Sequence, residues 1–478
     1  MKSLARHFLH ASALLIVSSA ASGAQSVAHR VEPALPGIDS LAAAAYAKDS
    51  LGSITVGVIA GADLVWTRSY GFANRASHKL ADRNTVYRIG SITKPFTAVM
   101  LMQLEHAGKI RLSDPVEKYV PELRKVDSMP AGASPPTLLQ LATMTAGLSR
   151  EPREEGPFWS GPVSKWEETL ISALPHTSYA YMPGTRFSYS NIGYAILGVA
   201  LGRAAGVPYT TWERTHVFEP LGMKRTRFEI DPSIATDLAT GYDENREGMV
   251  DSLTATKEAR DGRGYKVPNG AIFTTVDDMS RFVAFELGHG PASVLAAERL
   301  DSAFAGLVAT SADLDLGYGL GFMAMRRQAF TFTGHSGSVA GYVAFMYFDR
   351  QAQVGVVLFR NVTGGALNSN RLTMDILSRL VESSKQHHAV AIDPRIVDHY
   401  VGRYSVPGGG IMTVLRENEH FFTQREGQPK FEMLPEGDRE FFMKAFDAQV
   451  TFVTDSQGRA TGFIIHEGGE NIRLKRIE

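Results

Sequence analysis

The sequence predicts an α+β fold in which helices are inserted between two sets of strands and a small all-β domain follows. Three observations support this prediction. Apolar strand-like runs near residues 55 and 350 enclose a long region of helical patterns, the composition changes near residue 390, and the length exceeds the comfortable size of a single core. We therefore expect a mixed domain that ends near residue 385 and a second domain over residues 394–478.

The first residues have the layout of a cleavable secretory signal. Lys2 and Arg6 precede an apolar stretch through residues 14–17, and small residues follow at 22–24. We expect residues 1–24 to be a signal peptide that is cleaved after Ala24, and the mature protein to be periplasmic or secreted. The stretch is too short to be a stable membrane anchor, and the chain has no cysteine to carry a lipid or form a disulfide.

The first strands are predicted at residues 54–59 and 64–67, joined by a hairpin turn. The segment from Pro95 to His106 is apolar on most sides and is followed by Gly108, which predicts a buried central helix. The other elements predicted for this domain are helices at 138–144 and 194–204 and strands at 343–348 and 354–359.

Beyond residue 393 the chain consists of short alternating runs broken by Gly, Pro and Asp. Strands at such spacing predict a small antiparallel barrel or sandwich. The predicted strands lie at 399–404, 411–415, 440–443, 450–453 and 462–465. The polar stretch from Ser383 to His388 is the predicted linker.

The charge balance argues against nucleic acid as a partner. The chain has 49 Lys and Arg against 50 Asp and Glu, and the predicted signal holds two of the cations and none of the anions. A nearly neutral chain without a basic run has no field to attract nucleic acid or anionic lipid. With no cysteine and no H-E-x-x-H pair, the usual thiolate and zincin metal sites are absent. We expect a small ester, amide or peptide as partner, with no metal and no cofactor, and the oligomeric state stays open.

Ser91 and Lys94 form the only S-x-x-K in the chain, ahead of the predicted central helix. This spacing places a hydroxyl and an amine on one face of a first helical turn. Ser91 can be a nucleophile if Lys94 acts as its base, which requires burial or neighbouring positive charge to lower the pKa of the lysine from about 10.4. The structural alternative is that Ser91 caps the helix and Lys94 lies on a solvated face.

Tyr189 and Asn191 form the only Y-x-N, after a turn and before an apolar helix. Tyr189 can relay a proton from nucleophile to leaving group if nearby cations lower its pKa, and Asn191 can orient Lys94 and the substrate. The structural alternative is a turn at the start of a helix, capped by Ser190 or Asn191.

His335, Ser336 and Gly337 form an H-x-G, a weak pattern that also occurs at His106 and His466. We favour His335 because it is predicted at a strand edge that faces a cleft, where Gly337 lets a substrate approach the backbone. Residues 334–338 nearly match the nucleophile elbow G-x-S-x-G of α/β-hydrolases. The last position is serine, however, and a predicted strand follows instead of a helix.

The three elements in this order resemble the serine hydrolases of the class C β-lactamase and penicillin-binding-protein superfamily. The resemblance extends to longer segments and covers the chain from about residue 38 to 382. These segments are Tyr87–Ala98, Gly108–Val116, Leu138–Leu148, Pro183–Tyr194 and Phe218–Met223.

The resemblance implies a β-lactamase/transpeptidase-like domain over residues 38–385: an antiparallel sheet flanked by helices, plus a helical subdomain, with the site between them. The C-terminal region resembles the lipocalin-like modules appended to some peptidases of this superfamily, which implies a small antiparallel β-barrel.

The resemblance also implies roles for individual residues. Ser91 is the acylated nucleophile, Lys94 its base, Tyr189 the proton relay, and Asn191 a contact for Lys94 and substrate. The backbone N–H groups of Ser91 and Ser338 form the oxyanion hole. His335, Ser336 and Gly337 line the same site.

The third element departs from the K-T-G found in many relatives. A lysine there is a permanent cation for the carboxylate of a β-lactam or peptidyl-D-alanine, whereas a histidine with a pKa of about 6.5 is mostly neutral at pH 7. We therefore expect an exported serine hydrolase that cleaves short esters, amides or D-amino-acid peptides through an acyl-enzyme. A D-Ala-D-Ala carboxypeptidase or weak β-lactamase is the alternative. A third hypothesis is a non-catalytic binding or scaffold protein, which the presence of Ser91, Lys94 and Tyr189 together argues against.

Overall fold

The computed structural model describes residues 27–153, 157–244, 250–304, 308–310, 316–327, 330–387, 389–446, 448–467 and 470–477. The predicted signal peptide, residues 1–24, lies outside them. The chain divides into two compact units. The larger is Leu35–Val381, and the smaller joins the described residues before Leu35 to those from Glu382 onward.

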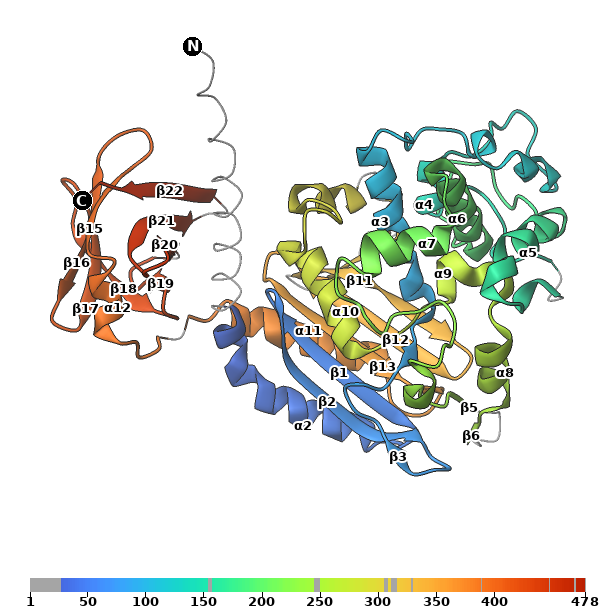
Figure 1. Ribbon diagram of the computed structural model, residues 1–478, viewed down its shortest axis with the longest axis horizontal. Helices are drawn as coiled ribbons and strands as arrows, with labels where there is room; N and C mark the ends of the chain where they lie inside the picture. The colour runs from blue at the N-terminus through green and yellow to red at the C-terminus, as the bar shows by residue number, and fades with distance from the viewer. Residues whose placement is uncertain are drawn as a thin grey trace, which may run out of the picture. The chain divides into compact units, whose positions relative to one another are not determined.

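The larger unit is built on an antiparallel sheet with the strand order β3-β2-β1-β13-β12-β11-β10-β9-β8 within the described residues (Figure 1). The strands are β1 Ser53–Ala60, β2 Asp63–Asn74, β3 Lys79–Leu80, β8 Val308–Ala309, β9 Leu316–Tyr318, β10 Met323–Arg327, β11 Phe330–Val339, β12 Tyr342–Asp349 and β13 Val354–Arg360. Because β1 pairs with β13, with Ile54 opposite Arg360, the two predicted sets of strands meet in one sheet.

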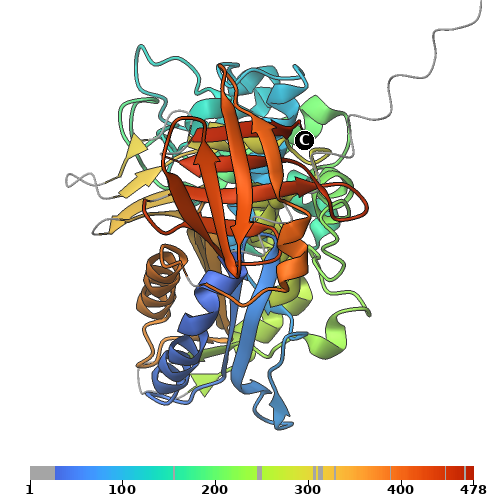
Figure 2. The same ribbon diagram turned by 90° about the vertical axis from the view of Figure 1, so that its left-hand side faces the viewer.

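Helices cover both faces of this sheet. Tyr70 of β2 donates a 2.7 Å hydrogen bond to Asp39 of α2 (Leu35–Tyr46), whereas Gly57 of β1 lies against Val276 of α10 (Val276–Ala284). Tyr70 is paired with Ile54, so their side chains point to the same face of the sheet. Ile54 and Gly57 are three residues apart on β1, and because side chains alternate along a strand they point to opposite faces. Helices α2 and α10 therefore lie on opposite faces. Helix α11 (Ser369–Ser384) lies beside α2 in both ribbon views (Figures 1 and 2).

A helical region is inserted between β3 and β8. Its core is α3 (Thr93–His106), where every residue from Thr93 to Met102 is buried, in agreement with the predicted central helix. The neighbouring helices are α4 Leu138–Ala142, α5 Trp166–Ala173, α6 Asn191–Ala205, α7 Tyr209–Glu213, α8 Leu253–Asp261 and α9 Val267–Gly270. Two small sheets complete the unit: β4 (Tyr87–Arg88) with β7 (Phe273–Thr274), and β14 (Val362–Thr363) with β5 (Tyr242–Glu244) and β6 (Val250–Asp251).

Among the described residues, no single helix is long and apolar enough to cross a membrane. The bent pair Asn191–Ala205 and Tyr209–Phe218 meets the length and composition criteria only when its two parts are taken together.

The smaller unit contains a closed antiparallel barrel, drawn in orange and red in Figures 1 and 2. Its strands are β15 Gly402–Ser405, β16 Ile411–Glu417, β17 His420–Arg425, β18 Lys430–Pro435, β19 Glu440–Met443, β20 Ala448–Thr454, β21 Ala460–Glu467 and β22 Glu470–Arg476. Aromatic side chains pack inside it, with ring centroids 4.7 Å apart for Tyr404 and Phe463 and 5.5 Å apart for Phe441 and Phe452. The core of this small barrel is therefore filled with side chains.

Several predicted boundaries in the C-terminal region are wrong. The strand expected from residue 399 begins at Gly402, because Asp393 caps a short helix, α12 (Pro394–Asp398), in front of it. The expected linker begins inside α11, which continues to Ser384. Strands β17, β18 and β22 were not predicted, since charged residues interrupt their alternation.

The N-terminal residues belong to the barrel unit. Arg30, which is buried, donates a 3.1 Å hydrogen bond to the buried carboxylate of Glu436. The hydroxyl of Ser383 donates to the backbone oxygen of Arg30 at 2.6 Å. The two ends of the described chain are thus joined inside one folding unit.

Candidate active site

Ser91 lies in a tight turn, Gly90–Ile92, directly before α3. Gly90 has a φ of +52°, and a Cβ there would lie 2.9 Å from the backbone nitrogen of Ser338, so the turn needs glycine. No side chain caps α3, and the Ser91 hydroxyl instead accepts a 3.0 Å hydrogen bond from Nζ of Lys94. The alternative that Ser91 is only a helix cap is therefore wrong.

Lys94 is fully buried and has three acceptors around its Nζ. Besides Ser91 Oγ, these are Oδ1 of Asn191 at 2.9 Å and the backbone oxygen of Asn269 at 3.2 Å. Burial lowers the pKa of Lys94 well below its usual value; the positive charges of Arg150, Arg263 and Lys266 act in the same direction, and Glu151 opposes them. The lowered pKa of Lys94 is the property that this lysine needs to act as the base for Ser91.

Tyr189 lies against the same lysine, with Nζ 4.8 Å from its ring centroid. Burial raises the pKa of Tyr189 to about 12, and the lowering effects of a hydrogen bond with Ser91 and of the Arg150 charge do not offset it. The condition that nearby cations lower this pKa overall is not met, so the phenol is protonated at neutral pH and suited to donate a proton. The neighbouring Ser190 caps α6 by accepting from the nitrogen of Gly193 at 3.0 Å, as the structural alternative held.

The third element lies in β11, directly beside the nucleophile turn. A Cβ at Gly337 would overlap the carbonyl oxygen of Ile89 and lie 3.0 Å from the backbone nitrogen of Ser91. The amide nitrogens of Ser91 and Ser338 therefore meet at one junction between the turn and the strand. The pairing of β10 with β11 ends at Gly334, which leaves the edge of residues 335–338 uncovered by β10.

His335 is buried behind this edge, with 2% of its surface exposed. Its Nδ1 lies 2.5 Å from the carbonyl oxygen of Ser336, and because a carbonyl only accepts, Nδ1 carries the proton and Nε2 accepts from the hydroxyl of Tyr318 at 3.1 Å. Burial, with a smaller effect of Lys94, lowers the pKa of His335 to about 3. The imidazole is neutral at pH 7, as predicted. Residues 334–338 lie within one strand, which excludes the nucleophile elbow.

A second layer of polar groups, which the sequence reasoning missed, holds Asn191. Its side-chain nitrogen donates to Oε1 of Glu151 at 2.7 Å, and its backbone oxygen accepts from the side chain of Asn269 at 2.7 Å. Glu151 also accepts from the hydroxyl of Tyr265, and Nζ of Lys266 lies 3.6 Å from it. Glu151 lies three residues after Leu138–Leu148, a segment that resembles the family, and this is its only mark in the sequence; nothing in the sequence marks Asn269.

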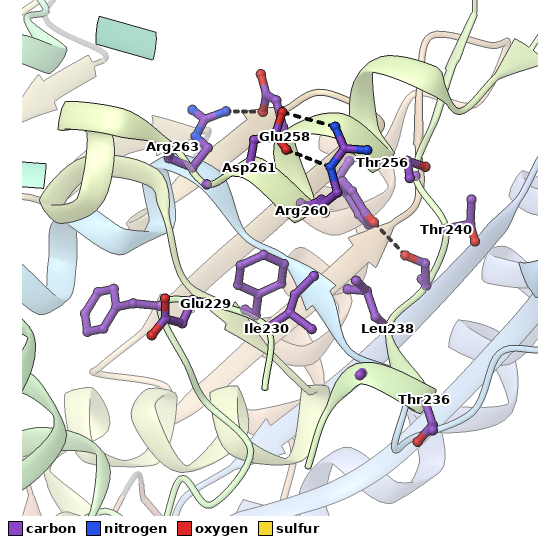
Figure 3. Close-up of a pocket in the computed structure, with 18 of the residues that line it drawn as sticks. Glu229, Ile230, Thr236, Leu238, Thr240, Thr256, Glu258, Arg260, Asp261 and Arg263 are labelled. Atoms are coloured by element: carbon purple, nitrogen blue, oxygen red, sulfur yellow. Dashed lines mark hydrogen bonds and ion pairs between the residues drawn. The ribbon is translucent and has the colours of Figure 1, made fainter. Parts of the chain in front are cut away.

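The same unit contains a cavity of about 680 Å³ that is lined by apolar side chains and by charged ones, including Glu258 and Arg263 (Figure 3). Ser91, Lys94 and Tyr189 do not line it. Arg263 links the two regions, since it pairs with Glu258 at 2.5 Å and its charge lowers the pKa of Lys94. In the part of the chain that the structure describes, no three His, Asp or Glu side chains are arranged to hold a metal ion.

Comparison with known families finds two matches along the chain. The family model described as "Beta-lactamase" matches residues 38–380. A domain of unknown function, DUF3471, matches residues 386–476, which contain the barrel.

Comparison with individual proteins agrees with this result. Penicillin-binding protein 4* of Bacillus subtilis (strain 168) is 25% identical over 449 residues, which cover 88% of this chain and 95% of that protein. The D-alanyl-D-alanine-carboxypeptidase/endopeptidase AmpH of Escherichia coli (strain K12) is 30% identical over 218 residues, which cover 45% of this chain and 52% of AmpH.

Solved structures show the same fold. The octameric penicillin-binding protein homologue from Pyrococcus abyssi has a TM-score of 0.60 at 23% identity and covers 92% of this chain and 99% of its own. A D-stereospecific amidohydrolase from Streptomyces sp. has a TM-score of 0.57 at 21% identity and covers 71% of this chain and 98% of its own.

Proposed function

Because the chain belongs to the β-lactamase family, we propose that it is a serine hydrolase that forms an acyl-enzyme on Ser91 and cleaves short esters, amides or D-amino-acid peptides. The observation that carries the proposal is the 3.0 Å hydrogen bond between Ser91 and Lys94, whose burial lowers its pKa. When Lys94 is neutral, the two N–H bonds of Nζ serve the oxygens of Asn191 and Asn269, and its lone pair can accept the proton of the Ser91 hydroxyl.

The first half of the reaction uses the junction between the nucleophile turn and β11. Ser91 Oγ attacks the substrate carbonyl while its proton passes to Nζ of Lys94. The backbone N–H groups of Ser91 and Ser338 donate to the oxyanion that forms. Donors of this kind, held in place before the reaction, stabilise the transition state, and losing one typically costs about a hundredfold to a thousandfold in rate.

The leaving group then needs a proton, which the protonated phenol of Tyr189 supplies. Lys94 returns the proton it received to Tyr189, so the two groups end this half of the reaction in their starting states. In the second half, water attacks the ester on Ser91 while Lys94 takes one proton from it, and that proton passes to Ser91 Oγ as the bond between Oγ and the acyl carbon breaks. Asn191 keeps Lys94 directed at Ser91 throughout, because its oxygen accepts from Nζ at 2.9 Å.

A D-Ala-D-Ala carboxypeptidase is the second candidate. It is favoured by similarity to AmpH and to a structure titled D-alanine carboxypeptidase AmpC from Burkholderia cenocepacia, with a TM-score of 0.58 at 20% identity. The neutral His335 does not itself favour this candidate, since the third element offers no cation to a terminal carboxylate. Weak β-lactamase activity belongs to this second candidate.

We also propose that the protein is exported after cleavage behind Ala24, to act in the periplasm or outside the cell. The support is the layout of residues 1–24. N-terminal sequencing of the secreted or periplasmic product tests this proposal.

A fluorophosphonate probe followed by intact mass measurement tests the acyl-enzyme. One adduct is expected on the wild type and on Ser172→Ala, which changes an exposed serine of α5, and none on Ser91→Ala with unchanged circular dichroism. Lack of any adduct on the folded wild type would reject Ser91 as an activated nucleophile. A panel of p-nitrophenyl esters, D-amino-acid amides, D-Ala-D-Ala peptides and a chromogenic β-lactam then ranks the substrates by kcat/KM.

A further inference from the structure

The charges around the candidate site are unbalanced. Among the charged side chains that act on Lys94, Arg150, Arg263 and Lys266 are positive and Glu151 is negative, and Glu258 pairs with Arg263. A site with an excess of positive charge favours a negatively charged substrate.

Two of the three cations are already engaged. Lys266 is buried against Trp159, with Nζ 3.4 Å from the ring centroid, and faces Glu151. Arg263 forms an ion pair with Glu258. His335 adds no charge, because both of its ring nitrogens are occupied by hydrogen bonds within the protein.

Arg150 is different from these groups. It is exposed, and its guanidinium carbon lies 4.9 Å from the ring centroid of Tyr189. Its backbone oxygen accepts from the nitrogen of Asn191 at 2.9 Å, which fixes the residue to the Y-x-N segment. Among the described residues, the guanidinium of Arg150 has no ion pair or hydrogen-bond partner. The next residue, Glu151, directs its carboxylate to Asn191 instead.

We propose that Arg150 binds a carboxylate of the substrate beside Tyr189, so that this hydrolase selects acyl donors that carry a negative charge near the scissile bond. This inference rests on the proposed function. The third element offers no cation to the substrate, and Arg150, on the helical side of the site, supplies one instead.

The chemistry of arginine suits this role. A guanidinium is always charged and presents its N–H groups as a planar fork that matches the two oxygens of a carboxylate. Contact with an aromatic ring limits the motion of the side chain and leaves the edge of the fork free. A charge-assisted hydrogen bond at such a site changes the discrimination between charged and neutral substrates by about tenfold to a hundredfold.

Two substrate pairs test the proposal and locate the carboxylate. N-acetyl-D-alanyl-D-alanine and its C-terminal amide differ by a carboxylate on the leaving group. Mono-p-nitrophenyl adipate and p-nitrophenyl hexanoate differ by a carboxylate on the acyl group. The readout is the ratio of kcat/KM within each pair for the wild type, Arg150→Gln and Arg150→Lys.

Arg186 provides a matched control, because it is an exposed arginine whose guanidinium carbon lies 3.4 Å from the ring centroid of a different tyrosine, Tyr181. We expect the wild type and Arg186→Gln to prefer the charged member of at least one pair by tenfold or more. Arg150→Gln should bring this ratio close to one, mainly through a higher KM, and Arg150→Lys should keep part of it.

Two results would overturn the inference while the proposed function stands: hydrolysis of the neutral ester with no preference for either carboxylate, or a preference that survives in Arg150→Gln. Failure of the fluorophosphonate to label Ser91 would remove the proposed function, and the inference with it.

Discussion

The side-chain amide of Asn191 donates a 2.7 Å hydrogen bond to the carboxylate of Glu151. The oxygen of the same amide accepts from Lys94, so this contact determines which end of Asn191 faces the base. Glu151 also raises the pKa of Lys94 through its negative charge. One carboxylate therefore controls both the orientation of Asn191 and the basicity of Lys94.

Glu151→Gln should move the acid limb of the pH profile of kcat/KM to lower pH. The negative charge of Glu151 raises the pKa of Lys94, so its removal lowers that pKa further and leaves the lysine neutral in more acidic solution. We also expect kcat to fall by about tenfold, because a glutamine can present its amide nitrogen to Asn191 and turn it. The measurement is kcat/KM on a neutral ester between pH 4 and pH 9.

Tyr265→Phe is the control for this experiment, since it removes a hydrogen bond to Glu151 but keeps the charge. Its acid limb should stay where the wild type has it. An unchanged limb in Glu151→Gln would show that Lys94 is not the group that titrates.

His335 should make the protein less stable in acid. Its pKa is about 3 in the folded state against about 6.5 when unfolded, so below pH 6.5 the unfolded chain binds a proton that the folded chain does not. The contribution of this residue is therefore present above pH 6.5 and is lost as the pH falls. Urea unfolding at pH 7 and pH 5 should show a smaller loss of unfolding free energy for His335→Gln than for the wild type. Equal losses in both proteins would contradict the low pKa.

Gly337→Ala should lower kcat/KM by a hundredfold or more. The added Cβ would overlap the carbonyl oxygen of Ile89 and push β11 away from the nucleophile turn, which separates the two oxyanion donors. Gly37→Ala is the matched control, because the nearest atom to a Cβ there is 3.9 Å away, at the end of Arg379. Both variants are assayed on a neutral ester after circular dichroism confirms folding. Wild-type activity in Gly337→Ala would exclude the proposed oxyanion hole.

Glu286→Gln should stabilise the protein at alkaline pH. This carboxyl is 2% exposed, one of its oxygens has no hydrogen-bond partner among the described residues, and burial raises its pKa to about 8. Between about pH 4.5 and pH 8 the unfolded chain releases a proton that the folded chain keeps, so stability falls as the pH rises. Thermal unfolding should show a rise in Tm of several degrees for the variant at pH 8 and little change at pH 4.5. The exposed Glu105→Gln should show no such difference between the two pH values.

Much of the fold was predictable because strong apolar patterns mark it. The helix that carries Lys94 and the strands β1, β12 and β13 are buried runs with clear start and stop signals. The barrel was predictable as a class, but the strand at 430–435 alternates charged and apolar residues around a surface that only the closed barrel defines. The predicted strand at 399–404 begins only at Gly402, because the turn that follows the short helix behind Asp393 occupies its first residues.

The site was predictable where a motif marks it. Ser91, Lys94, Tyr189 and Asn191 are brought together as the motifs imply, and the third element lies beside the nucleophile turn. Glu151, Asn269 and Tyr318 come from segments far apart in the chain and act only through contacts that folding creates. The direction of the Tyr189 pKa shift could not be predicted, because the burial of this residue, which a sequence does not give, outweighs the charges around it.

The pair formed by Arg30 and Glu436 has a consequence for the timing of folding during synthesis. The two residues are 406 positions apart, and at about 5 to 20 residues per second a ribosome makes Arg30 roughly 20 to 80 seconds before its partner. Residues 35–381 are synthesised before Glu436, so the larger unit can fold while residues 27–34 still lack the residues of the smaller unit that they contact. When synthesis is arrested near residue 400, we expect a protease to cut the chain on the N-terminal side of residue 35 and to leave the larger unit intact. The barrel unit is then the last part of the molecule to fold, and its barrel can close only when the C-terminal strand β22 has been synthesised.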